Sequence, residues 1–461
     1  MPINSFLYPG AKVTPAYEVA NSCRFNDGDS PSMSKSISST SASWTFSAWV
    51  KRGSNLGTAN YLVSWGDSGT DATGIGFDSG NNFFYYSEDS PDNILVETTA
   101  VYRDVSAWYH LVCKCSSGSI TLYVNGASAA TGSGGNALDS STLAIGKWVT
   151  AAYYHDGYMA EVVFIDGTAY SASDFGEFDD DSPTIWKPKD VSGLTFGTHG
   201  FYLDFEASGN LGNDANGGTD LSESNLAATD QATDTPTNNF CTMDPLDNYY
   251  AASTFSEGNC KIVTASSPYS SNKGTFPLSK GKWYFEVEYD ARSGSEDLFH
   301  LGISSTQDTA NNQGLGYHPN DWGRSTFSNR AYGYFNNNSW TNFGTASTPN
   351  AIIGCYVDLD NLKLYWAVDG TVENSGTGID ITAVASTPFG FYLPALSWQD
   401  GSTTGTLLCN FGGCSAFTVS SGNTDANGYG NFEFDPSAGT FDSASKDFLA
   451  ICSKNLAEYG G

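Results

Sequence analysis

The stretch IGCYVDLDNLKLYWAVDG, residues 353–370, combines an apolar, aromatic run with three aspartates. Side chains two positions apart in a strand lie on the same face, and two apolar faces emerge at that period: Ile353, Cys355, Val357 and Leu359, then Leu362, Leu364, Trp366 and Val368. This pattern predicts two antiparallel strands. Asp360-Asn361 stands where a two-residue turn is needed, and Asp369-Gly370 stands where the next turn begins. We interpret these aspartates as fold-determining residues, and leave Asp358 without an assigned role.

Further strands are predicted on both sides of this hairpin. The second half of the chain contains GKWYFEVEYD (281–290), FHLGIS (299–304), RAYGYFNNNSW (330–340), FGFYLPALSW (389–398) and TGTLLCNFGG (404–413). The first half contains WTFSAWVKRG (44–53), AWYHLVCKC (107–115), GSITLYVNG (118–126), LAIGKWV (143–149) and DGYMAEVVFIDGTAYSASDF (156–175). Residues 44–50 alternate as a half-buried strand does, and Asn125-Gly126 predicts a type I′ hairpin turn. Many short strands with regular turn signals predict an all-β chain of two sandwiches.

Five segments follow from this pattern. We expect an N-terminal arm over residues 1–22, a first sandwich over 23–178, a connector over 179–246, a second sandwich over 247–415 and a C-terminal tail over 416–461. The connector is rich in Pro, Gly, Asn, Asp and Thr, and we expect it to be draped over the sandwiches. Its one predicted strand, GFYLDFE (200–206), needs a sheet to join. The only short helix predicted is KDFLAICSKNL (446–456).

Composition and charge exclude several classes of protein. The net charge of −30 repels phosphate backbones, so we expect no nucleic-acid partner. No run approaches about 18 apolar residues, so no membrane insertion is expected, and the first 20 residues do not resemble a signal peptide. The nine cysteines have no metal-like spacing and are interpreted as buried thiols of a protein made in a reducing cytoplasm. The five histidines offer no zinc pattern.

Catalytic and metal sites have weak signals. Glycoside hydrolysis needs two carboxylates about 5–10 Å apart, a spacing that two sets on single strands could meet: Glu286, Glu288 and Asp290, and Glu177, Asp179 and Asp181. We interpret the Glu286 set as a solvent-facing strand edge, and predict no enzyme. Calcium remains open as a cofactor, because Asp67, Asp71 and Asp78, or Asp27 and Asp29, supply oxygen ligands in loops. Solvated turn acids are the alternative.

Ligand recognition has a clearer signal in the loops of the second sandwich. The loops at 317–324, 329–340 and 397–402 are rich in rings and amides, with few charges. The candidate ligand-binding residues are Trp322, Arg324, Tyr332, Tyr334, Trp340 and Trp398. Such rings could stack on sugar faces while Asn336, Asn337 and Asn338 bond hydroxyl groups. The alternative is that alternation places some of these rings in the core.

Three resemblances add to this interpretation. The first region, through AWYHLVCKC, LYVNG, LAIG and GYMAEVV, resembles a laminin-G-like jelly roll of the concanavalin A type. The second, through GKWYFEVEYD, FHLGIS, IGCYVDLDNLKLYWAVDG and LLCNFGG, resembles a SPRY (B30.2-like) domain. The order of RFNDGDSPSMS, WTFSAWVKRG, AEVVFIDG, WKPKD, GFYLDF, DTPTNNF and FLAICSKNL resembles tail-fibre or structural virion proteins of tailed bacteriophages. The resemblance spans about Arg24 to Leu456 and implies a virion component.

The predicted function is therefore that of a phage virion protein, as tail fibre, appendage or capsid decoration. It would be made in the host cytoplasm and displayed on the particle. We expect it to adhere to a host-surface glycan or protein, and to assemble with copies of itself and with other virion proteins. A purely structural capsid or tail component is the alternative, and a glycan depolymerase is a further one. The uncharged start of the arm, residues 1–11, favours a role for the arm in anchoring to the particle.

Overall fold

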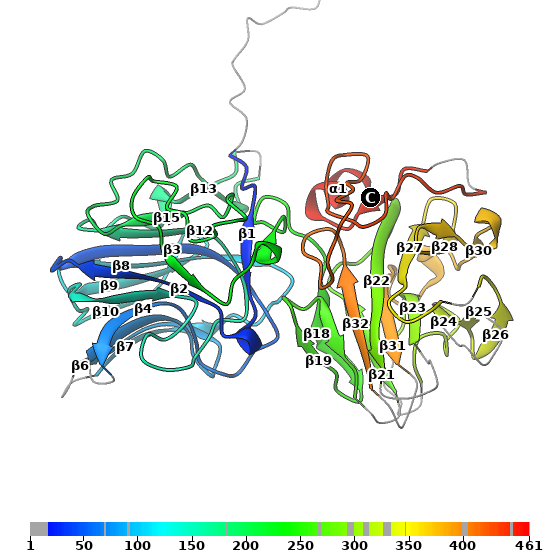
Figure 1. The fold of residues 1–461 in the computed structure, drawn as a ribbon, viewed down its shortest axis with the longest axis horizontal. Coiled ribbons are helices and arrows are strands. Elements are labelled where there is room, and N and C mark those ends of the chain that lie inside the picture. The colour runs from blue at the N-terminus through cyan, green and yellow to red at the C-terminus, as the bar shows by residue number, and fades with distance from the viewer. Residues whose placement is uncertain are drawn as a thin grey trace, which may run out of the picture.

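The computed structural model describes residues 17–68, 71–89, 93–180, 182–265, 269–292, 299–307, 313–325, 333–345, 347–398, 404–442 and 446–460. Figure 1 shows two β-sandwiches side by side, which confirms the predicted all-β class. In the described residues the one α-helix is α1 (Ser453–Tyr459), at the top of the second sandwich. No helix in that part of the chain is long and apolar enough to cross a membrane.

The first sandwich pairs an eight-stranded with a seven-stranded antiparallel sheet around one core. Sheet A has the order β10 (Ala127–Ser133), β9 (Ser119–Val124), β8 (Trp108–Ser116), β3 (Ser43–Arg52), β12 (Gly157–Asp166), β1 (Ser22–Phe25) and β17 (Gln231–Ala232), with β15 (Phe201–Leu203) also on β12. Sheet B has the order β16 (Ser222–Ser224), β2 (Ser32–Ser38), β11 (Ser140–Ile145), β4 (Asn60–Ser68), β5 (Asp71–Phe77), β6 (Asn82–Asp89) and β7 (Ile94–Val101). A separate hairpin joins β13 (Gly176–Phe178) to β14 (Trp186–Pro188).

The second sandwich has a seven-stranded and a nine-stranded sheet. Sheet C has the order β18 (Met243–Tyr250), β21 (Ser270–Gly274), β31 (Leu393–Trp398), β23 (Phe299–Ser304), β24 (Asp321–Ser325), β25 (Gly333–Asn336) and β26 (Ser339–Asn342). Sheet D has the order β19 (Thr254–Ser256), β20 (Lys261–Val263), β32 (Gly405–Asn410), β22 (Lys282–Arg292), β27 (Ile352–Asp358), β28 (Lys363–Val368) and β29 (Thr371–Val372); β30 (Ile379–Asp380) also pairs with β28, and β33 (Leu449–Ala450) with β22. The 3-10 turns are Asp27–Asp29, Ala172–Asp174, Ala228–Asp230, Asn374–Gly376 and Val384–Ser386.

The hairpin of residues 353–370 is the β27–β28 pair, with its first apolar face buried as predicted. Its turn spans residues 359–362, because Asp358 pairs with Lys363, so it is longer than the two residues expected. Asp358 closes that turn: its carboxylate accepts hydrogen bonds from the backbone and side-chain amides of Asn361, both at 2.9 Å. It also forms an ion pair with Lys282 at 3.1 Å. The tight turns predicted at Asn125-Gly126 and at Asp369-Gly370 both have the positive φ angles of type I′.

The connector adds strands to the first sandwich. The predicted strand within 200–206 is β15, which pairs with β12. The sequence predicted one strand in residues 179–246, whereas β14, β15, β16 and β17 all lie there. β16 extends sheet B and β17 extends sheet A. Short, polar strands of two or three residues have no periodicity that a sequence pattern could detect.

The C-terminal tail covers the outer face of sheet D. Phe432, Phe441 and Phe448 of the tail pack with Tyr284 and Tyr356 in a second apolar layer. Residues 446–456, predicted as a helix, begin instead as β33, which runs parallel to β22, and only Ser453–Tyr459 is helical. The predicted solvent-facing edge at Glu286 is therefore wrong. β22 lies in the middle of sheet D, and Glu286 is buried under the tail.

The outer face of β3 is buried as well, so the prediction of a half-buried strand was wrong. Thr45, Ser47 and Trp49 are as buried as the core face. Trp49 packs at the junction between the sandwiches. The β13–β14 hairpin and the loop that follows it cover the neighbouring part of sheet A.

The N-terminal arm joins the two sandwiches. The arm was predicted to lie outside both, but its described part makes contacts with each of them. The Tyr17 hydroxyl donates to Glu161 at 2.8 Å, Val19 is buried at the junction, and Glu18 pairs with Lys454 of α1. All nine cysteines lie in the described residues and are free and buried, as the sequence predicted.

Candidate functional site

The structure places two of the predicted ligand-binding rings in the core of the second sandwich. Trp322 is 4% exposed and Trp398 is fully buried. Both belong to the apolar cluster between sheets C and D. They lie in β24 and β31, and they take the inward positions of those strands. Neither ring can contact a ligand at the surface.

The other predicted residues divide between structural and surface positions. Arg324 is buried and forms a bidentate pair with Glu373, at 2.6 Å and 2.9 Å. Tyr334 is half-buried and its ring stacks on Trp366. Trp340, on the edge strand β26, is half-buried and donates to Asn342. Tyr332 lies outside the described residues. The described members therefore do not form one exposed site, although Arg324 and Tyr334 lie opposite each other on β24 and β25.

The predicted calcium ligands are also spread over separate places. Asp67 and Asp71 lie near the β4–β5 turn, whereas Asp78 follows the far end of β5. The seven residues of β5 span roughly 23 Å at 3.3 Å per residue, too far for one ion. Asp27 and Asp29 accept hydrogen bonds from Asn55 and Asn26. Among the residues that the structure describes, no three His, Cys, Asp or Glu side chains gather as a metal site requires.

Three of the carboxyl groups considered for catalysis, Glu286, Glu177 and Asp179, make hydrogen bonds or ion pairs within the protein. Glu286 accepts hydrogen bonds from Tyr284 (2.8 Å), Asn410 (2.8 Å) and the backbone of Glu433 (2.7 Å). Burial raises the pKa of Glu286 to about 7. Glu177 and Asp179 pair with Lys187, and Asp181 lies outside the described residues. Glu286 is therefore not placed to face a sugar across an open site.

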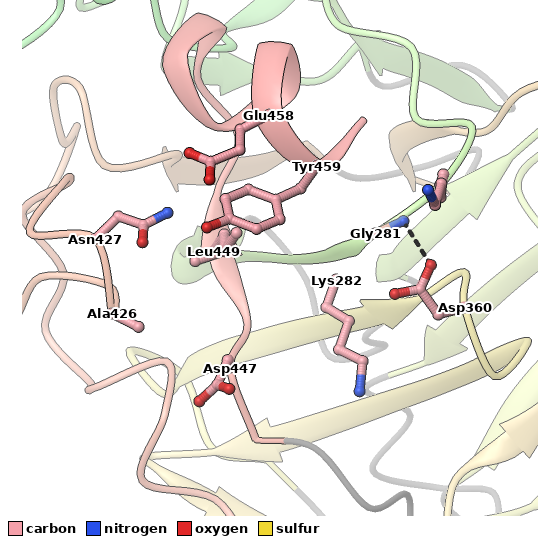
Figure 2. A pocket seen from close by; sticks show the side chains of 10 residues that line it. Gly281, Lys282, Asp360, Ala426, Asn427, Asp447, Leu449, Glu458 and Tyr459 are labelled. Atoms are coloured by element: carbon pink, nitrogen blue, oxygen red, sulfur yellow. Dashed lines mark hydrogen bonds between the residues drawn. The ribbon is translucent and has the colours of Figure 1, made fainter. Parts of the chain in front are cut away.

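A groove with a volume of about 440 Å³ lies between sheet D and the tail. Figure 2 shows the Tyr459 ring at its centre, between Asn427 on one side and Lys282 and Asp360 on the other. The groove is lined by Lys280, Gly281, Lys282, Asp360, Ala426, Asn427, Asp447, Leu449, Glu458 and Tyr459. Tyr459 is 37% exposed, an unusual position for a large ring in this chain. The volume lies within the range of small-ligand sites.

Hydrogen bonds hold both walls of this groove in place. On one wall, the backbone N–H of Gly281 donates to Asp360 at 3.1 Å, and its φ of +88° needs glycine. On the other, the buried Asp425 accepts from the backbone N–H groups of Asn427 and Ala450, both at 2.9 Å. Asp425 thereby ties the loop at 425–430 to β33. The groove is consequently pre-formed rather than dependent on a ligand.

The groove offers hydrogen-bonding groups of every kind around one ring. Its carboxylates accept, its lysine ammonium groups donate, and the Asn427 amide does both. Leu449, Ala426 and the Tyr459 ring provide apolar surface. This arrangement can orient a ligand with an apolar face and many hydroxyl groups.

Sequence reasoning missed this groove because it placed the search in other loops. Asp360 was interpreted as a turn residue, and residues 416–461 as a tail. Tyr459 lies just beyond the predicted helix, and nothing in the sequence distinguishes it from the other tyrosines. Residues that meet from positions 280, 360, 427 and 459 share no local pattern.

Part of the chain matches a known family. Residues 26–174 match the model of the concanavalin A-like lectin/glucanases superfamily. That match covers most of the first sandwich and does not include the groove.

The chain is similar to several solved structures. It covers 96% of the SPRY domain of human HERC1 over 36% of its own length, with 13% identity and a TM-score of 0.29. It covers 64% of domain 4 of the Geobacillus stearothermophilus arabinanase AbnA, solved with arabinotriose, over 29% of its own length, with 20% identity and a TM-score of 0.26. It covers 58% of a putative carbohydrate-binding protein from Bacteroides ovatus over 45% of its own length, with 16% identity and a TM-score of 0.34. A search of curated proteins found no match.

Proposed function

We propose that this chain is a glycan-binding module of a tailed-phage virion, which contributes to adhesion at the host surface. The observation that carries the proposal is the pre-formed groove around Tyr459, with its mixed polar lining. A sugar ring presents an apolar face to an aromatic ring and hydroxyl groups around its rim. The groove has a complementary group for each of these features.

Charge favours a hydroxyl-rich ligand over a phosphate-rich one. Two lysines and three acids line the groove, so an anion gains little there. The chain as a whole carries a net charge of −30, which repels nucleic acids and other polyanions. A neutral glycan meets no such barrier, because its hydroxyl groups both donate and accept hydrogen bonds.

The virion role rests on the ordered motifs from about Arg24 to Leu456 that resemble phage structural proteins. In that role the protein would be present in several copies on each particle, and avidity would make weak single sites effective. Locating the chain within intact particles tests this part. A position on a tail or appendage agrees with adhesion, and absence from the particle overturns the virion role.

The binding site itself is tested with a glycan array, followed by calorimetry on the best glycans. Tyr459→Ala should weaken binding about tenfold or more, the usual size of loss for a truncated aromatic anchor. The matched control is Tyr153→Ala, an exposed tyrosine of the first sandwich at 47% exposure. It should leave binding unchanged. The opposite result, loss only in Tyr153→Ala, would move the site to the first sandwich.

The same experiment separates binding from cleavage. We propose binding without hydrolysis, so the bound glycan should keep its chain length after long incubation. Shortened chains would make the protein a depolymerase.

A purely structural role is the second candidate, and one observation favours it. The edge strand β7 exposes Leu95 and Val101, at 55% and 48%. Exposed apolar residues on the edge strand of a sheet are a common feature of subunit contacts. Failure of every glycan to bind, together with self-association that Leu95→Lys abolishes, would favour this candidate.

A further inference from the structure

The groove around Tyr459 carries more negative than positive charge. Its charged lining consists of two lysines and three acids: Lys280, Lys282, Asp360, Asp447 and Glu458. Lys282 forms an ion pair at 3.1 Å with Asp358, which is fully buried and does not line the groove. Because this pair neutralises Lys282, the other lysine alone faces three carboxylates. A ligand in the groove therefore meets an excess of two negative charges, one positive against three negative.

Two of the three carboxylates are open to a ligand. Figure 2 shows Glu458 above the Tyr459 ring and Asp447 below it in this view. Lys282 and Asp360 lie farther to the right. Glu458 and Asp447 are both exposed, and neither forms an ion pair with any residue that the structure describes. Their charges are therefore not compensated within that part of the chain.

The end of α1 adds partial negative charge to the same space. Tyr459 is the last residue of α1, and the last carbonyl groups of a helix have no partner within the helix. The carbonyl oxygen of Tyr459 would lie 2.9 Å from a Cβ atom placed on Gly281, so this oxygen lies at the wall of the groove. A carbonyl oxygen accepts hydrogen bonds and cannot donate them, which again favours a ligand that donates.

We propose that the glycan bound in the Tyr459 groove contains an amino sugar whose amine is free and positively charged. This inference rests on the proposed glycan-binding function and names the class of its ligand. An ammonium group donates several hydrogen bonds to carboxylate and carbonyl oxygens, and the face of a tyrosine ring attracts it. The groove offers all three kinds of partner around one ring.

Other classes of sugar fit this charge less well. A neutral sugar has a hydroxyl group in place of the ammonium group, so it leaves the excess negative charge uncompensated. An N-acetylated amine is neutral as well. A uronic acid or a sulfated sugar adds negative charge and is repelled by Glu458 and Asp447. The order of affinity should therefore be cationic, then neutral, then anionic glycans.

The test compares two tetrasaccharides that differ in a single group on each sugar. These are the β-1,4-linked tetramer of glucosamine and cellotetraose, which has a hydroxyl group in place of each amine. Affinity is measured by calorimetry on the full chain at about pH 5.5, where amines are protonated and exposed carboxyl groups are ionised. The wild type should bind the glucosamine tetramer about tenfold more tightly than cellotetraose.

Variants decide whether the groove causes this preference, because a chain with a net charge of −30 attracts any cation. Glu458→Gln and Asp447→Asn each remove one charge with little change in size. Each should weaken binding of the glucosamine tetramer about three- to tenfold and leave the affinity for cellotetraose unchanged. The matched control is Glu97→Gln, at an exposed position on β7 of the other sandwich. It removes the same charge from the chain and should change neither affinity.

The possible failures are distinct. If neutral or acidic glycans of the array bind more tightly than every glycan with a free amine, the amino-sugar inference is wrong and the groove remains a glycan site. Equal weakening by Glu97→Gln and Glu458→Gln would assign the preference to the overall charge and also overturn the inference. No binding of the wild type to either tetramer or to any array glycan would overturn the proposed function as well.

Discussion

Glu161 and Glu286 are buried carboxyl groups at comparable positions in the two sandwiches. Each lies on a central strand, and each receives hydrogen bonds from side chains or backbone of distant segments. Glu161 accepts from Tyr17 of the arm and from Tyr202 of the connector, both at 2.8 Å. Its φ of 51° lies at a bulge in β12. Through these hydrogen bonds, Glu161 and Glu286 hold segments from distant parts of the chain against the outer face of a sheet.

Titration of these groups should be visible in the stability of the protein. The pKa of Glu161 is raised from 4.5 to about 7, chiefly by burial; the hydrogen bonds from Tyr17 and Tyr202 lower this pKa, and nearby Asp204 and Glu206 raise it. Because the folded pKa is the higher one, the stabilising contribution is complete below pH 4.5 and is lost as the pH rises through 7. The advantage of wild type over Glu161→Gln in free energy of unfolding should therefore shrink from about pH 5 to about pH 8.

Urea unfolding at several pH values measures this difference. Glu97→Gln, at an exposed position of β7, is the control. A wild-type advantage that stays constant with pH would mean that the tyrosine hydroxyl groups keep Glu161 ionised throughout.

At the scale of elements, the strands alternate as the sequence predicted, but both faces of the central strands are covered. The covers are segments far away in the chain: the tail on sheet D, and the β13–β14 hairpin on sheet A. Alternation predicts which side chains share a face. It does not show whether another layer buries the second face.

The N-terminal arm provides a test of this covering role. Deletion of residues 1–16 keeps every contact described for residues 17–21 and serves as the reference variant. Deletion of residues 1–21 removes the Tyr17–Glu161 hydrogen bond and the buried Val19. It should cost about 2 kcal/mol or more of unfolding free energy. Urea midpoints compare the two, and equal stability would mean that residues 17–21 contribute no net energy.

The shorter deletion is also the better test of anchoring. If residues 1–16 attach the chain to the particle, that variant should fold normally and fail to incorporate. Normal incorporation would exclude an anchor in this segment.

At the scale of the whole molecule, the two sandwiches are joined by buried polar contacts. The Lys51 ammonium donates to Asp234 (2.7 Å), Asn239 (2.8 Å) and the carbonyl of Phe240 (2.8 Å). The side chain of Arg24 pairs with Asp230 and Glu257 at 3.0 Å and 2.9 Å. These contacts hold the two sandwiches together. The groove around Tyr459 therefore keeps a defined orientation relative to the first sandwich.

Removal of one partner should weaken this junction strongly. Asp234→Ala leaves Lys51 buried with an unpaired charge, which costs about 3–5 kcal/mol. Calorimetry should show a lower melting temperature and a transition that separates into two. Asp180→Ala, at an exposed position, is the control. A normal, single transition in Asp234→Ala would show that apolar packing alone joins the sandwiches.

The all-β class, the β27–β28 hairpin, the type I′ turn at Asn125-Gly126 and the buried thiols could all be predicted from the sequence. These depend on local periodicity and turn chemistry, which neighbouring residues specify. The role of Asp358, the burial of Trp322 and Trp398, and the groove around Tyr459 became visible only in the three-dimensional structure. Each of these depends on segments that meet from distant parts of the chain, and contacts of that kind leave no pattern in the local sequence.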